Sequence, residues 1–118
     1  GTIPIQPEWR AALITGFRGA VQNPKGTAYY DFNNPEDQAM DIAGKTGTAQ
    51  LNAPRQNTSV FTSFAPAASP RYVVDAFMED SGYGASVAAP VVREIYDALF
   101  NTPVQPVTYS AAGSGGQN

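Results

Sequence analysis

The 118-residue sequence contains no cysteine and no histidine, and each absence removes a class of chemistry. Without cysteine, the chain forms no disulfide and carries no thiolate nucleophile. Without histidine, it cannot complete a Ser-His-Asp triad or a histidine-based metal site by itself. Proton transfer within this chain is therefore left to lysine, carboxyl groups, tyrosine or water, and we expect no metal ion and no cofactor.

Charge and long apolar runs are also scarce. Only 14% of the residues are charged, whereas 42% are hydrophobic, and the net charge is −3. The seven basic residues are scattered, so the basic stripe that a phosphate backbone requires is missing, and we expect no nucleic-acid partner. No apolar run is long enough for a membrane span, and no signal-peptide pattern is present. The composition is too apolar for a disordered chain, and the few charges suggest that other protein covers part of its surface.

The first part of the chain predicts a helix followed by a loop. Apolar side chains recur at helical spacing over roughly residues 7–22. They are Trp9, Leu13, Phe17 and Val21. Residues 23–41 are rich in turn-forming residues and are predicted to be a loop, in which we interpret Asp37 and Asp41 as solvated carboxylates.

Three strands and a second helix are predicted after this loop. Strand signals begin at Ile42, return over 58–65 and again over 71–79, with a turn at 66–70 that makes the last two an antiparallel hairpin. The mixed apolar content of 71–79 predicts a strand covered on both faces. Ser86 is expected to cap a helix. The apolar stripe of this helix is formed by Ala88, Val92, Ile95 and Leu99.

The predicted elements form a thin core for an independent domain. Eight large apolar residues are expected inside: Trp9, Phe17, Tyr72, Val74, Phe77, Val92, Ile95 and Leu99. Residues 1–101 are expected to fold, whereas residues 102–118 form a flexible tail rich in Pro, Gly and Ser. Three strands and two helices leave outer faces that need further layers, and the chain starts at Gly1 rather than Met. We therefore expect this chain to be part of a larger domain.

The stretch from Ile42 to Gln50 is the most informative part of the sequence. It places Lys45 between two glycines and follows it with Thr46 and Thr48. In a strand, the two threonines point to one face and the lysine to the other. Glycine lets a ligand approach the main chain closely. A strand edge with backbone N–H groups, a cation and two hydroxyls is suited to hold an acyl group and a carboxylate.

Two other interpretations of this stretch compete with a ligand-binding strand. A phosphate-binding loop needs glycine at position 39, which is alanine, and a helix that starts at Lys45 and Thr46. Gly47 and Pro54 oppose such a helix. The second alternative is a surface strand whose glycines and threonines merely suit a sheet edge.

Four segments, by their order and spacing, favour a ligand-binding strand. They are 43–50, 60–66, 70–74 and 84–91. Together they resemble the C-terminal part of the transpeptidase domain of class B penicillin-binding proteins, with Lys45-Thr46-Gly47 as the family's Lys-Thr-Gly motif. The resemblance covers roughly residues 1–100. It is closer to the elongation type, often called penicillin-binding protein 2, than to the division type.

The resemblance implies an α+β fold in which a five-stranded antiparallel sheet lies between helices, with about three strands and two main helices in this chain. It implies a peptidoglycan D,D-transpeptidase that forms an acyl-serine intermediate and is acylated by β-lactams. By motif match, the hydroxyls of Thr46 and Thr48 would bind the substrate carboxylate. The backbone N–H of Thr48 would be one oxyanion donor, and Lys45 would supply positive potential for the proton path. Gly47 would stay small so that the substrate lies along the strand.

The family's other two motifs are missing from this chain. No Ser-x-x-Lys exists, because the only lysines are Lys25 and Lys45 and the residues three before them are Gln22 and Ile42. Ser-x-Asn is also absent. The resemblance therefore implies that an N-terminal portion of the same domain carries the nucleophile, and the chain alone is predicted to be inactive. The implied partners are that portion, stem peptides of peptidoglycan, β-lactams and the cell-wall synthesis machinery, at the extracytoplasmic face of a bacterial membrane.

Three other functions stay open at this point. A catalytically inactive binding or scaffold module would keep the strand and perform no chemistry. A D,D-carboxypeptidase would pass the acyl group to water, and a β-lactam sensor would stop at the acyl-enzyme.

Overall fold

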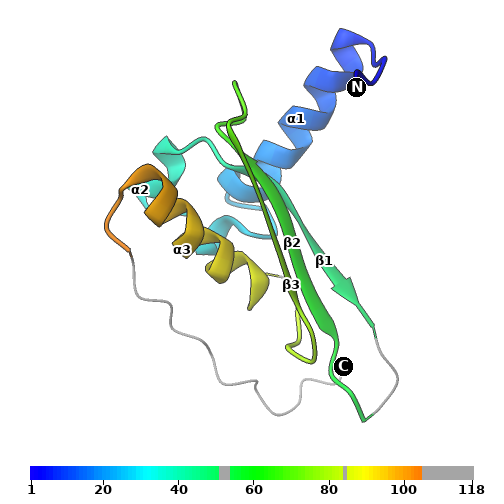
Figure 1. The fold of residues 1–118 in the computed structure, drawn as a ribbon, viewed down its shortest axis with the longest axis vertical. Helices are drawn as coiled ribbons and strands as arrows, with labels where there is room; N and C mark the ends of the chain where they lie inside the picture. Colours follow the sequence, from blue (N-terminus) through cyan, green and yellow to red (C-terminus); the bar gives the residue numbers. More distant parts are fainter. Residues whose placement is uncertain (51–53, 84, 105–118) are drawn as a thin grey trace.

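The computed structural model of the chain describes residues 1–50, 54–83 and 85–104. Parts of two segments named above lie outside these residues: Gly84 of the segment 84–91, and 105–118 of the predicted tail. The described chain contains α1 (Pro7–Gln22), η1 (Tyr29–Asp31), α2 (Pro35–Ala39), β1 (Ala43–Ala49), β2 (Thr58–Ala65), β3 (Tyr72–Met78) and α3 (Ala88–Phe100), as Figure 1 shows. None of its helices is both long and apolar enough to cross a membrane.

The first helix forms where the sequence predicts it. Pro7 occupies the first turn, where its missing N–H is no loss, and Glu8 complements the helix dipole there. The helix ends at Asn23, whose backbone N–H donates to the carbonyl of Gly19 over 3.3 Å. The prediction of a helix over 7–22 is confirmed.

The strands form one antiparallel sheet in the order β1-β2-β3. Lys45 of β1 lies opposite Thr62 of β2, and Ser63 of β2 lies opposite Val74 of β3. The connection between β2 and β3 is short, so these two strands are the predicted hairpin. The α+β class, with about three strands and two main helices, is confirmed.

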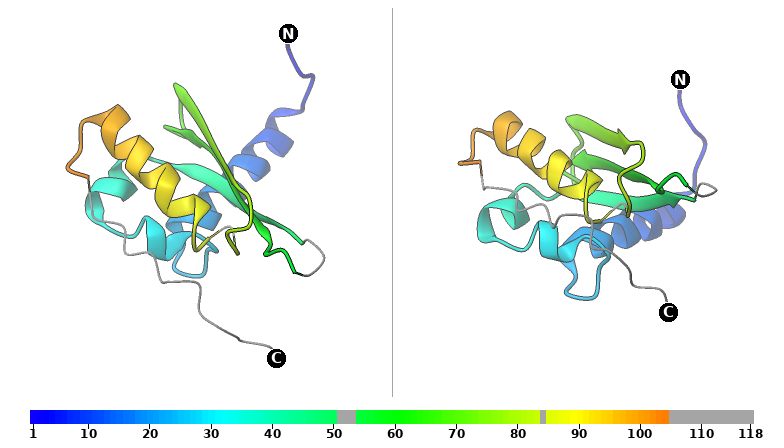
Figure 2. Two further views of the ribbon diagram at one scale, coloured as in Figure 1. Left: turned by 60° about the horizontal axis from the view of Figure 1, so that its bottom comes forward. Right: turned by 90° about the horizontal axis from the view of Figure 1, so that it is seen from below.

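The two long helices cover opposite faces of the sheet (Figures 1 and 2). Phe64 of β2 packs its ring edge-on against Phe17 of α1, with 6.2 Å between ring centroids. Its neighbour Ser63 points to the other face, where its Oγ lies 3.1 Å from the hydroxyl of Tyr96 in α3. Since successive side chains of a strand alternate between faces, these two contacts assign α1 to one face and α3 to the other.

The hydrophobic core lies on the α3 side of the sheet. Phe61 of β2 stacks on Phe32 with 5.6 Å between ring centroids, and both rings are fully buried. The core cluster consists of Val21, Ala28, Phe32, Met40, Ile42, Phe61, Ala65, Val74, Ala76, Ala88, Ala89, Val92 and Tyr96.

Half of the predicted core is wrong. The side chains of Trp9, Phe77, Ile95 and Leu99 are 60%, 63%, 40% and 38% exposed, respectively. Val74 and Val92 are buried as expected, and Phe17 and Tyr72 are half-buried. The apolar periodicity of these segments predicts the helices and the strand that the structure shows. Within the described residues, however, α1 packs mainly on β1 and leaves the same face of β3 uncovered.

Within the part of the chain that the structure describes, the strand predicted over 71–79 is covered on one face only. Val74 and Ala76 are buried toward α3, whereas Val73 is 76% exposed. The prediction that both faces of this strand are covered is therefore wrong for the described residues. It rested on the apolar residues of the other face, which are exposed here.

The start of the last helix also differs from the prediction. Val87 occupies the N-cap position without a side-chain cap, so Ser86 is not the cap. The hydroxyl of Ser59, on β2, accepts the backbone N–H of Ala88 over 3.1 Å. The buried stripe of α3 runs through Ala88, Val92 and Tyr96, which turns Ile95 and Leu99 toward the surface. The cap comes from a residue distant in sequence, which a local rule does not find.

The predicted loop over 23–41 contains η1 and the short helix α2. Asn34 caps α2 by accepting the backbone N–H of Asp37 over 2.8 Å. Asp37 is 2% exposed, so the interpretation of it as solvated is wrong. Asp41 is half-buried and forms an ion pair of 2.6 Å with Arg18 on α1, so it is not a solvated carboxylate either.

Candidate functional site

The strand β1 carries all four residues that the sequence singles out. Lys45 and Gly47 lie opposite Thr62 and Val60 on the α1 side of the sheet. Thr46 lies opposite Phe61, on the other face. The predicted alternation of lysine and threonines is therefore confirmed.

The strand runs from the core to the surface. Ala43 and Gly44 are fully or nearly fully buried, whereas Lys45 and Thr48 are exposed. Gly44 has no room for a side chain, because a Cβ there would lie 2.7 Å from Cζ of Phe61 and 2.9 Å from the carbonyl oxygen of Thr62. This close approach holds β1 on the sheet just before the four candidate residues begin.

One edge of β1 has no strand partner among the described residues, since β1 is the first strand in the order β1-β2-β3. An edge strand offers backbone N–H and C=O groups to an added extended chain. Lys45, Thr46, Gly47 and Thr48 lie along this edge. It is therefore an edge of the sheet on which a peptide-like ligand can pair with main chain.

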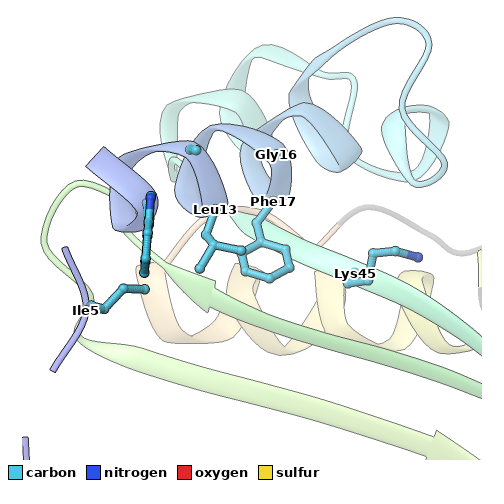
Figure 3. Close-up of a pocket in the computed structure, with 7 residues that line it drawn as sticks. Ile5, Leu13, Gly16, Phe17 and Lys45 are labelled. Atoms are coloured by element: carbon cyan, nitrogen blue, oxygen red, sulfur yellow. The ribbon is translucent and has the colours of Figure 1, made fainter. Parts of the chain in front are cut away.

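Lys45 borders a groove between β1 and α1. A cavity of about 660 Å³ is lined by the apolar face of α1 together with Lys45. Figure 3 shows Leu13 and Phe17 extending from α1 beside the strand that carries Lys45. The apolar lining is incompletely covered, because Trp9 and Leu13 are 60% and 51% exposed. A second cavity, of about 470 Å³, lies near the end of α1. It shares the lining residues Gly16 and Lys45 with the groove.

A residue that the sequence reasoning missed reaches the site from the segment after α1. The hydroxyl of Thr27 lies 3.0 Å from the hydroxyl of Thr46. Gly26 brings Thr27 there, because a Cβ at position 26 would lie 2.3 Å from the carbonyl oxygen of Gly19 on α1. The glycine in Lys25-Gly26-Thr27 was the available signal, since a glycine often marks a close backbone approach.

The chemistry that these residues support is limited and specific. They offer a lysine cation, hydroxyl groups and strand backbone to a ligand at the edge of β1. The ammonium group of Lys45 donates to the carbonyl of Thr46 over 2.7 Å. No group of three or more metal-ligating side chains occurs in residues 1–50, 54–83 and 85–104. The carboxylates of Asp37 and Asp41 each have their own partners, Asn34 and Arg18, and do not form a catalytic pair.

The comparisons with known proteins show the family of the chain. Residues 1–97 match the transpeptidase family, described as the penicillin binding protein transpeptidase domain. The chain is 32% identical over 112 residues to the peptidoglycan D,D-transpeptidase MrdA of Haemophilus influenzae, and the match covers 83% of this chain and 17% of that protein.

Two solved structures show the same fold. PBP2 of Pseudomonas aeruginosa, solved in complex with WCK 5153, superposes with a TM-score of 0.66 at 32% identity, over 84% of this chain and 24% of that one. The transpeptidase domain of the FtsI4 D,D-transpeptidase from Legionella pneumophila gives a TM-score of 0.66 at 30% identity, over 80% and 37% of the two chains. The present chain thus spans about a sixth of the length of the curated relatives that it matches.

Proposed function

The chain belongs to the penicillin-binding protein transpeptidase domain family, and from this premise we propose that it supplies one wall of the acyl-transfer site of a peptidoglycan D,D-transpeptidase. The observation that carries the proposal is the Lys45-Thr46-Gly47-Thr48 sequence on β1, at a sheet edge without a strand partner among the described residues. A strand edge of this kind suits an extended peptide ending in a carboxylate.

The proposed roles follow from the chemistry of each group. The hydroxyls of Thr46 and Thr48 bind the terminal carboxylate of the stem peptide, and the backbone N–H of Thr48 donates to the developing oxyanion. One oxyanion donor is worth about two to three orders of magnitude in rate. Lys45 supplies positive potential for the proton path, which in Ser-His-Asp enzymes runs through a histidine instead. Gly47 leaves the strand edge open to the substrate, and β-lactams occupy the same place.

The nucleophilic serine belongs to a portion of the domain outside this chain. Two features support this proposal: the sequence has no Ser-x-x-Lys, and the chain spans only 17% of its first relatives. Exposed apolar side chains on the α1 side of the molecule provide a surface for that portion. They are Ile5, Trp9, Leu13, Val73 and Phe77.

The same relatives support a proposal for the cellular setting. They are peptidoglycan D,D-transpeptidases, and cell-wall peptide stems are found outside the cytoplasm. The proposed location is therefore the extracytoplasmic face of the bacterial membrane, with an anchor on a part of the protein outside this chain and with the cell-wall synthesis machinery as partner.

The experiment that tests the function is product analysis. The complete transpeptidase domain is incubated with a stem peptide ending in D-alanyl-D-alanine and with an amine acceptor, and the products are identified by mass spectrometry. We expect released D-alanine and a cross-linked peptide. Hydrolysed peptide without cross-links would identify a carboxypeptidase, and acylation by penicillin without either product would identify a β-lactam sensor. Failure to react with peptide and with penicillin would identify an inactive module and contradict the proposal.

A further inference from the structure

The carboxylate of Asp41 joins three separate parts of the molecule just before β1 begins. It accepts hydrogen bonds from Nε and Nη2 of Arg18 over 2.8 and 2.6 Å, and from Nε2 of Gln22 over 3.1 Å. Both donors are on α1. The carboxylate also accepts the backbone N–H of Ala68, in the turn between β2 and β3, over 2.9 Å. The backbone carbonyl of Asp41 accepts the N–H of Ala67, in the same turn, over 2.7 Å.

The backbone of Asp41 serves the same junction. Its φ of 52° lies in the left-handed region, which aspartate and asparagine tolerate better than most residues. The hydrogen bonds from Arg18 hold the pKa of the Asp41 carboxyl below its ordinary value. A two-point arginine–carboxylate pair fixes orientation as well as distance, so Asp41 determines how α1 lies relative to the start of β1.

From α1, the contacts return to the candidate site. The N–H of Ala28 donates to the carbonyl of Ala20 on α1 over 2.9 Å, and Gly26 packs directly on the carbonyl of Gly19. The segment held in this way carries Thr27, whose hydroxyl meets that of Thr46 on β1. The contacts therefore form a closed circuit from Asp41 through α1 and Thr27 back to β1.

The helix α1, which takes part in these contacts, also forms one side of the groove beside Lys45. Gly16 and Phe17 of α1 line that groove together with Lys45 (Figure 3). Gln22 adds a second tie, because its Nε2 also donates to the carbonyl of Ile42 over 3.1 Å. The position of α1 thus affects both the lysine and the hydroxyl of Thr46.

We propose that Asp41 is a positioning residue for acyl transfer: it holds α1 and the Thr27 segment at the distance from β1 that presents Lys45 and Thr46 to the substrate. The proposal rests on the proposed function. Misplacement of reacting groups by about 1 Å lowers an enzymatic rate by about 100-fold. A loss of the carboxylate therefore affects the rate of the folded protein and not only its stability.

The test uses Asp41→Gly in the complete transpeptidase domain. Glycine adopts the left-handed backbone without strain, so the variant removes the carboxylate and leaves the turn. Asp41→Asn is the second variant, because asparagine also tolerates this backbone and keeps one acceptor oxygen. Asp80→Gly is the matched control: Asp80 has a φ of 51° and an arginine partner, Arg55, at 3.4 Å, but this pair is exposed and follows β3, which is separated from β1 by β2.

Two measurements separate positioning from stability. The first is the acylation rate constant for a fluorescent penicillin, per folded molecule and well below the melting temperature. We expect a decrease of about 10–100-fold in Asp41→Gly, a smaller decrease in Asp41→Asn, and less than a twofold change in Asp80→Gly. A lower melting temperature with an unchanged acylation rate constant in both Asp41 variants would overturn the proposal.

The second measurement does not depend on acylation. Backbone amide exchange in segments 26–28 and 43–49 is expected to accelerate at least about tenfold in Asp41→Gly and to stay constant in Asp80→Gly. If the wild-type domain fails to react with penicillin, the proposed function fails, and amide exchange still decides whether Asp41 positions these segments. Unchanged exchange in both segments would overturn the positioning role.

Discussion

Replacing the buried Asp37 by asparagine is expected to stabilise the protein at neutral pH. Asp37 is 2% exposed, and its Oδ1 has no hydrogen-bond partner among the described residues. Its Oδ2 accepts a hydrogen bond of 2.7 Å from Nδ2 of Asn34. Asparagine keeps the shape of the side chain and an acceptor for Asn34, but carries no charge.

The magnitude follows from the environment of this carboxyl. Burial, and then the negative charge of Asp97, raise the pKa of Asp37 from 3.8 to about 6, although Arg93 and Asn34 oppose the increase. The folded protein therefore binds this proton more tightly than the unfolded chain does. The stability that results is complete below the unfolded pKa of 3.8 and is lost as pH rises through about 6. At about 1.4 kcal/mol per pH unit, the loss amounts to at most about 3 kcal/mol.

The assay is urea unfolding of the complete domain, wild type and Asp37→Asn, at about pH 4 and about pH 7.5. The quantity compared is the free energy of unfolding of the variant minus that of the wild type. This difference is expected to be about 1–3 kcal/mol larger at the higher pH than at the lower one. Burial also raises the pKa of Asp31 to about 6, but Asp31 titrates in both proteins and cancels in the difference. Asp75→Asn, at an exposed position of β3, is the control and is expected to show no such change. A difference that stays constant with pH, or grows as pH falls, would refute the reasoning.

Two further variants test the packing that supports β1. Gly44→Ala is expected to lower the free energy of unfolding by about 1–3 kcal/mol, since its Cβ would meet Phe61 and the main chain at under 3.0 Å. Gly47→Ala is the comparison, because its nearest contact is 3.4 Å away, and equal losses in unfolding measurements would contradict this explanation. Tyr96→Phe is expected to cost about 1 kcal/mol in the same assay, because it removes the buried hydrogen bond to Ser63. A loss below the experimental error would show that this bond contributes nothing net.

The local patterns of the sequence were sufficient for the main elements. Period-3.6 spacing from Trp9 to Val21 and the β-branched run over 58–65 predict α1 and β2 with their observed bounds. The sequence does not predict the short helix α2, because its five residues are too few to show a period and its cap, Asn34, lies in a stretch rich in turn-forming residues. The exposure of Trp9 and Phe77 was missed for a different reason. Periodicity identifies an apolar face, but it does not show whether another element of the same chain covers that face.

For the candidate site, the sequence predicts the strand but not its supports. The alternation of Lys45 and Thr46 follows from strand geometry, and the family match confirms the resemblance on which their proposed roles rest. Thr27 and Asp41 were not identified, because each acts through contacts with residues 19 or more positions away. Such contacts depend on how α1 packs on β1, and no local pattern encodes them. The substrate-binding roles of Thr46 and Thr48 stay predictions.

The central claim is that β1 forms a wall of an acyl-transfer site, and Lys45→Ala tests it most directly. The complete domain is labelled with fluorescent penicillin, and the acylation rate constants of wild type, Lys45→Ala and Arg71→Ala are compared. Arg71 is the control, because it is an exposed cation stacked on Tyr72 of β3, which is separated from β1 by β2 in the sheet. We predict a decrease of at least about 100-fold for Lys45→Ala and less than twofold for Arg71→Ala. Equal acylation of the wild type and Lys45→Ala would contradict the account.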